Sequence, residues 1–118
     1  MSHTANGPKE PQRFGAVIGI KPEKIAEYTR LHTGDNCTIR DLLRKVNIGT
    51  NSIFLHEIEG KWYEFSYMEY IGDDYEGDMA KLVAEPRYQA WLNICDAMQI
   101  PLKGQKSWAP MKQIFYGP

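Results

Sequence analysis

The chain has 118 residues, of which 42% are hydrophobic and 25% are charged, and this composition predicts one globular domain with its own core. Lysine and arginine number 14 against 15 aspartate and glutamate residues, so the net charge of −1 provides no basic excess that would favour nucleic acid as a partner. No apolar run approaches the roughly 18 residues of a transmembrane helix, so we expect no contact with a membrane.

The first twelve residues are polar and contain glycine and proline, so we expect residues 1–12 to form a disordered tail and residues 13–118 to form a single domain. This tail lacks the apolar segment of a secretory signal. The two cysteines, Cys37 and Cys95, are too few for a disulfide framework, and their spacing fits no metal motif. We therefore expect a cytoplasmic protein with reduced thiols and no bound metal.

In chain order, the alternation of apolar side chains over residues 13–20 predicts a first strand. Pro22 suits the first turn of a helix, and apolar and aromatic residues then recur at helical spacing as far as His32. A second helical stretch is predicted between Thr38 and Val46, which carries an apolar stripe on one face.

Residues 47–51 predict a loop, and the two runs that follow, residues 52–59 and 61–71, predict a β-hairpin that turns at Gly60. The second run carries aromatic residues at both odd and even positions, so both of its faces are partly apolar. One layer of helices can cover only one of these faces. A symmetric homodimer that covers the other face is therefore predicted.

The polar segment 72–78 predicts a connection, and a short helix then precedes Glu85. Pro86 opens a further helix, whose buried stripe includes Trp91. After a loop rich in lysine, glycine and proline, residues 111–116 predict the last strand. The order strand, helix, strand, strand, helix, strand is typical of an α+β ferredoxin-like fold, in which one antiparallel sheet has its helices on one face.

The most informative polar pair is Tyr28 and His32, which stand four residues apart and so share one face of the first helix. Histidine titrates near neutrality, so this pair either exchanges protons with a ligand or simply packs. His56 is a weaker candidate, because it lies on a strand and points away from its neighbour Glu57. The acidic segment 72–78 lacks the full ligand pattern of a calcium loop and is interpreted as solvated.

Four short segments, in their order and spacing, carry a resemblance to a known family: EYTRLH (residues 27–32), NSIFL (51–55), the Trp91 and DAM (96–98) of AWLNICDAM, and QIFYGP (113–118). Together they make the chain from Arg13 to Pro118 similar to the L-rhamnose mutarotases. The resemblance implies a dimeric α+β barrel and an isomerase that needs no metal or other cofactor. It also implies a monosaccharide substrate, a deoxyhexose such as L-rhamnose, whose α and β anomers are interconverted by acid/base ring opening.

The resemblance also implies roles for individual residues. His32 is expected to be the principal acid/base residue, with Tyr28 beside it as a second catalytic residue that binds a sugar hydroxyl or assists the proton transfer. Trp91 is expected to provide an apolar wall for the sugar. Asn51, near the opening of a strand, and Tyr116, where the family ends with an aromatic residue or histidine, are expected to bind substrate.

The chain looks like a divergent member of the family that it resembles, because aromatic residues of the family's pattern are missing or moved. Asn36 and Cys37 lie where the family carries a Trp-Pro pair, and Ala90 precedes Trp91 where the family often has two tryptophans. Two alternatives to catalysis of mutarotation therefore stay open. One is a sugar-binding or regulatory module that has the same fold but no turnover, and the other is a different small enzyme on the same dimeric barrel, such as a cofactor-free monooxygenase.

Overall fold

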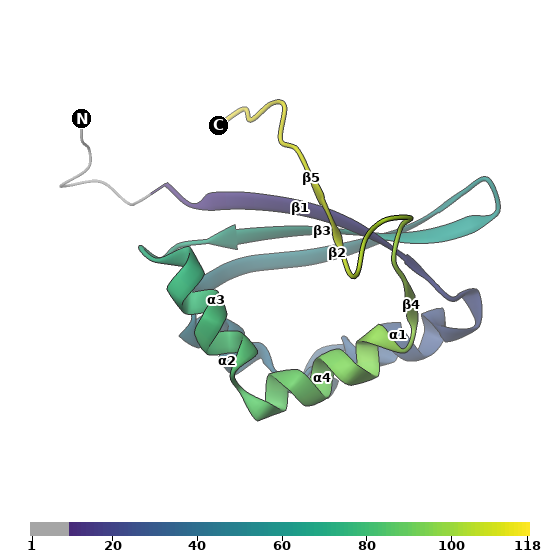
Figure 1. The fold of residues 1–118 in the computed structure, drawn as a ribbon, viewed down its shortest axis with the longest axis horizontal. Helices are drawn as coiled ribbons and strands as arrows, with labels where there is room; N and C mark the ends of the chain where they lie inside the picture. Colours follow the sequence, from purple (N-terminus) through teal and green to yellow (C-terminus); the bar gives the residue numbers. More distant parts are fainter. Residues whose placement is uncertain (1–9) are drawn as a thin grey trace.

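The computed structural model of the protein describes residues 10–118, which form one five-stranded antiparallel sheet with its helices on one face (Figure 1). The tail expected over residues 1–12 lies largely outside the described residues, and the first strand begins at Gln12. The strands are β1 (Gln12–Ile20), β2 (Ile48–Ile58), β3 (Lys61–Tyr70), β4 (Gln99–Ile100) and β5 (Ala109–Met111). The helices are α1 (Ile25–Leu31), α2 (Arg40–Lys45), α3 (Tyr75–Val83) and α4 (Pro86–Asp96), with 3₁₀ turns η1 (Pro22–Lys24) and η2 (Gly34–Asn36).

The order of the strands in the sheet is β2-β3-β1-β4, and β5 pairs with β1 beside β4. This order, with antiparallel pairing throughout, is that of the α+β ferredoxin-like fold, so the predicted fold class is confirmed. The hairpin between β2 and β3 turns at Glu59 and Gly60, whose φ angles are +51° and +83°. Two successive positive φ angles are characteristic of the tight turns that match the twist of a hairpin, as the glycine there predicts.

Three boundaries differ from the sequence predictions. The expected loop at residues 47–51 is wrong, because β2 already begins at Ile48 and is irregular in register between Ile48 and Asn51. The expected connection at residues 72–78 is too long, because Asp74 accepts a hydrogen bond from the Gly77 amide and caps α3, which begins at Tyr75.

The last strand is also misplaced by the apolar pattern. Residues 111–116 were expected to form it, but β5 ends at Met111, and Ile114 and Phe115 are 89% and 82% exposed. Pairing with β1 extends only from Gly15 to Val17, so the chain leaves the edge of β1 after Met111 although β1 itself continues to Gln12. An apolar run by itself does not indicate whether its residues pair with a neighbouring strand.

The core lies between the sheet and the helices, since Ile18, Ile20 and Tyr70 of the sheet are almost completely buried on that face. The helices contribute the other buried side chains, among them Tyr28, Leu42, Leu82, Trp91 and Cys95. β4 can pack closely against β1 because β1 carries Gly19 there, where a β-carbon would lie 2.7 Å from the carbonyl oxygen of Ile100. None of the helices between residues 10 and 118 is long and apolar enough to cross a membrane.

The opposite face of the sheet carries no helix of the described chain (Figure 1). Register places Phe54 of β2 opposite Phe65 of β3, which in turn pairs with Val17 of β1, so these three side chains form an apolar row on that face. Phe54 is 64% exposed. The apolar second face that the sequence predicts is therefore present, while the homodimer expected to cover it stays a prediction.

Candidate active site

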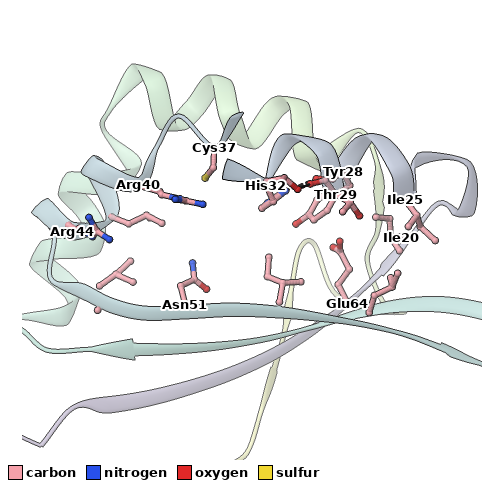
Figure 2. Close-up of a pocket in the computed structure, with 16 residues that line it drawn as sticks. Ile20, Ile25, Tyr28, Thr29, His32, Cys37, Arg40, Arg44, Asn51 and Glu64 are labelled. Atoms are coloured by element: carbon pink, nitrogen blue, oxygen red, sulfur yellow. Dashed lines mark hydrogen bonds between the residues drawn. The ribbon is translucent and has the colours of Figure 1, made fainter. Parts of the chain in front are cut away.

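Two adjoining cavities of about 480 and 440 Å³ lie between the helices and the sheet. The first is shown in Figure 2, with α1 and α2 above it and the strands of the sheet below it. Tyr28, His32 and Asn51 line both cavities, so these three residues, selected from the sequence, lie where the two spaces meet.

The imidazole of His32 stands at the C-terminus of α1, because the backbone of this residue caps the helix. Its Nδ1 atom lies 2.7 Å from the backbone carbonyl oxygen of Tyr28, one turn earlier. A carbonyl oxygen can only accept, so Nδ1 carries the hydrogen and donates it. The proton of the neutral ring is thereby placed on Nδ1, and Nε2 is left as an unprotonated base.

Two aromatic rings orient this imidazole. The Tyr28 ring stacks on it with centroids 4.2 Å apart and planes 23° apart, and Trp91 meets it edge-on at 5.0 Å. Burial lowers the pKa of His32, and the hydrogen bond to the Tyr28 carbonyl offsets this only in part. The ring is therefore mostly neutral at pH 7, in the form that accepts a proton.

The phenol of Tyr28 is buried, and its oxygen lies 3.2 Å from the side-chain amide nitrogen of Gln99, which donates a hydrogen bond to it. Burial raises the pKa of Tyr28 far above its ordinary value, and the nearby Glu64 carboxylate raises it further. The hydroxyl consequently keeps its proton at every physiological pH. Tyr28 is thus suited to donate a hydrogen bond to a ligand and unsuited to act as a base.

A carboxyl that was not selected from the sequence, that of Glu64 on β3, lines the first cavity together with Tyr28 and His32. Its side chain points from the sheet towards Tyr28 (Figure 2), it is only 2% exposed, and its Oε1 accepts a hydrogen bond of 2.9 Å from the Gln99 amide. Burial raises the pKa of Glu64 to about 7, and the hydrogen bond from Gln99 opposes this only in part. Among residues 10–118 no lysine, arginine or histidine forms an ion pair with it.

A signal for Glu64 was present in the sequence. The side chains of β3 alternate between two faces, and Glu64 falls on the same face as Trp62 and Met68, which pack against the core. A carboxyl on a buried face destabilises the fold unless it is hydrogen-bonded or paired, so a glutamate at such a position is a candidate functional residue. Gln99 carried no such signal, because it belongs to a two-residue strand that was not expected.

The far end of the first cavity has a different character. Arg40 and Arg44, one turn apart on α2, line it together with Cys37, and the amide of Asn51 points up from β2 on the opposite side (Figure 2). Neither arginine is in an ion pair with a carboxylate of the described residues. This end of the cavity therefore offers N–H donors to the oxygen atoms of a ligand.

The other two residues selected from the sequence lie further out. Trp91 lines the second cavity only, where it stands behind His32. Tyr116 lines neither cavity, and its ring packs under the guanidinium of Arg13, 3.7 Å from ring centroid to Cζ. The structure thus brings Tyr28, His32, Asn51 and Trp91 together, and it does not bring Tyr116 to them.

Within residues 10–118, no three histidine, cysteine, aspartate or glutamate side chains lie close enough together to bind one metal ion. His56, whose strand position disfavoured a catalytic role, is absent from the lining of both cavities. The chemistry available in the cavities is proton transfer by His32 and Glu64, with Tyr28, Asn51 and the two arginines as hydrogen-bond donors.

Comparisons with known proteins identify the family and agree with the fold. A family described as L-rhamnose mutarotase matches residues 13–117. The crystal structure of an L-rhamnose mutarotase from Formosa agariphila superposes with a TM-score of 0.67 at 16% identity, over 91% of this chain and 99% of that one. At this identity the superposition shows the fold alone. Among curated proteins, none has a matching sequence.

Proposed function

Because the chain belongs to the L-rhamnose mutarotase family, we propose that it is an isomerase that interconverts the α and β anomers of a deoxyhexose such as L-rhamnose. The observation that carries this proposal is the contact between His32 Nδ1 and the Tyr28 carbonyl, which leaves Nε2 as a base at the junction of two cavities. Mutarotation requires a base of this kind at neutral pH.

In the proposed reaction, Nε2 of His32 takes the proton of the anomeric hydroxyl. The bond between C1 and the ring oxygen breaks, C1 becomes the carbonyl carbon of the open-chain aldehyde, and the ring oxygen takes up a proton to become a hydroxyl. Rotation about C1–C2 then presents the other face of the carbonyl. When the hydroxyl attacks that face, the imidazolium returns its proton to the carbonyl oxygen, and the other anomer forms.

The remaining residues bind and orient the sugar in this proposal. Tyr28 donates a hydrogen bond to a sugar oxygen from a hydroxyl that stays protonated, and Asn51 binds further hydroxyls from the sheet side. Trp91 supports the imidazole edge-on and adds apolar wall to the second cavity, against the C–H face of the sugar. The polar and apolar parts of the lining suit a deoxy sugar, which carries hydroxyls and a methyl group.

The assembly that we propose is a homodimer. The apolar row on the second sheet face is too exposed at Phe54 to be explained within one chain. A second copy that packs by the same face would cover it in both subunits at once.

The test is NMR exchange spectroscopy on free sugars at anomeric equilibrium, in a panel that contains L-rhamnose, L-fucose and their common relatives. We expect the exchange rate for at least one deoxyhexose to rise in proportion to protein concentration, and to be unaffected by a chelator. A protein that broadens sugar signals without accelerating exchange would instead be the binding module. Unchanged exchange and unchanged signals across the panel would contradict both functions.

A further inference from the structure

Ring opening requires a second proton-transfer group besides His32. While His32 handles the proton of the anomeric hydroxyl, a second group must give a proton to the ring oxygen and take it back on closure. The described residues that line the two cavities include one further group that titrates near neutrality, and this is the carboxyl of Glu64.

The contacts of Glu64 place it on the same wall as His32. The Gln99 amide nitrogen carries two hydrogens, and it donates to Glu64 Oε1 at 2.9 Å and to the Tyr28 hydroxyl oxygen at 3.2 Å. The Tyr28 ring in turn stacks on the imidazole of His32. One amide therefore fixes the carboxyl and the phenol together, and the phenol fixes the imidazole.

A comparison within the protein separates this carboxyl from a structural one. Asp78 is also buried, but its Oδ2 accepts hydrogen bonds from Tyr70 and Asn47, and Lys81 Nζ lies 3.9 Å from its Oδ1. The hydrogen bond from Tyr70, above all, lowers the pKa of Asp78, so that this carboxylate stays ionised and satisfied. Glu64 has no cationic partner within residues 10–118, and it faces a cavity.

We propose that Glu64 is the second catalytic residue of the site and exchanges a proton with the ring oxygen of the sugar while His32 exchanges one with the anomeric hydroxyl. This inference rests on the proposed mutarotase function and adds a residue to it. Before ring opening, Glu64 is a carboxylic acid and His32 is neutral. The geometry that carries the proposal is the carboxyl of Glu64 in the cavity wall, aimed at the helix that bears Tyr28 and His32 (Figure 2).

The proton balance closes over one turnover. On opening, His32 gains the proton of the anomeric hydroxyl, and the electron pair of the C1–O5 bond leaves with the ring oxygen, which takes the proton of Glu64. On closure, the Glu64 carboxylate removes that proton as the oxygen attacks C1, and the imidazolium protonates the former carbonyl oxygen. Both residues return to their starting protonation states, so no oxidant, reductant or other co-reactant is needed.

The neighbours of Glu64 allow it to titrate independently of other charges near pH 7. Tyr28 on α1 and Cys95 on α4 face it, and burial keeps both neutral, with the pKa of Cys95 raised to about 12. Gln99 on β4 carries no charge. The cross-strand neighbours of Glu64, Ile18 and Leu55, are apolar. His32, which lines the same cavity, is neutral before ring opening, and the permanently charged residues of the lining, Arg40 and Arg44, lie at its other end (Figure 2).

A pH profile is therefore the sharpest test. Exchange needs neutral His32 and protonated Glu64, so kcat/KM should rise as pH passes the lowered pKa of His32 and fall as Glu64 ionises around pH 7. Glu64→Gln keeps the size and the hydrogen bonds of the side chain but cannot transfer a proton. We expect it to slow exchange by roughly 10²–10⁴-fold and to abolish the fall on the alkaline side. Glu64→Asp should recover part of the rate and the alkaline fall.

The matched control is Asp78→Asn, which alters the other buried carboxyl and touches neither cavity. Its exchange rate per folded molecule and its pH profile should equal those of the wild type. If Glu64→Gln keeps the alkaline fall, even with a slower rate, Glu64 only positions other groups and the proposal is wrong. An unchanged rate in that variant would also overturn it and would leave the mutarotase function standing, whereas a wild type without exchange on any sugar would remove both.

Discussion

Nδ1 of His32 donates a hydrogen bond to the carbonyl oxygen of Tyr28 at 2.7 Å, and the two side chains of these residues stack 4.2 Å apart. The backbone of one residue thus fixes the tautomer of the other, while the ring of the same residue fixes its plane. Two residues one helical turn apart thus produce a neutral imidazole whose Nε2 is free to accept a proton.

Replacement of His32 by asparagine is expected to slow anomer exchange by roughly 10²–10⁴-fold, the usual contribution of a general acid or base. The amide of asparagine remains polar but cannot accept the proton. Exchange rates by NMR and a melting curve for the variant check this prediction. If the residue merely packs between Tyr28 and Trp91, the melting temperature would fall and the rate per folded molecule would stay at the wild-type value.

Replacement of Tyr28 by phenylalanine should lower kcat less than His32→Asn does and raise KM more. The raised pKa of the phenol makes it a hydrogen-bond donor and not a group that transfers a proton. The variant keeps the stacked ring but leaves one N–H of Gln99 without its acceptor. We expect a loss of about 1–3 kcal/mol in the free energy of unfolding. Substrate titrations and urea unfolding measure the two effects, and a loss of kcat as large as that of His32→Asn would refute the donor role.

The stability of the protein should depend on the ionisation of Glu64. Its pKa is about 7 in the folded state against an ordinary value of 4.5, so between these values the unfolded chain has lost a proton that the folded chain keeps. The free energy of unfolding therefore falls as pH rises through this window, by at most about 1.4 kcal/mol per pH unit. Below the window the effect vanishes, and above it the loss is complete.

Glu64→Gln removes this pH dependence, so its stability relative to the wild type should increase between about pH 5 and pH 8, by up to roughly 3 kcal/mol. Urea unfolding of both proteins across that range provides the measurement, and it requires no substrate. Parallel stability curves for the two proteins would mean that the carboxyl does not titrate near neutrality.

The open sheet face should control the oligomeric state. Phe54→Glu places a charge in the apolar row formed with Phe65 and Val17, and burial of an unpaired charge opposes association. We expect the wild type to be a dimer at micromolar concentration and this variant to be a monomer by light scattering. Ile94→Glu is the control, because Ile94 is also exposed and apolar but lies on α4, in the layer of helices. A monomeric wild type would contradict the predicted assembly.

The sequence by itself determined the elements whose signals are local. Periodicity indicated the helices that carry Tyr28 and Trp91, and the glycine at residue 60 placed the hairpin turn. The pairing of Tyr28 with His32 also followed from sequence, since four residues along a helix always place two side chains on one face. Their roles were implied by the family resemblance, and the family itself is confirmed by the match over residues 13–117.

Only the tertiary structure decided what surrounds that pair. Gln99 donates hydrogen bonds to Tyr28, 71 residues away in sequence, and to Glu64, 35 residues away. It lies on a strand of two residues, which no sequence pattern predicted. The same is true of the chain end, where the chain leaves the edge of β1 after Met111 although its apolar run continues. Contacts of this kind depend on which edges and faces meet after folding, and a carboxyl acquires its pKa only from the burial that such contacts create.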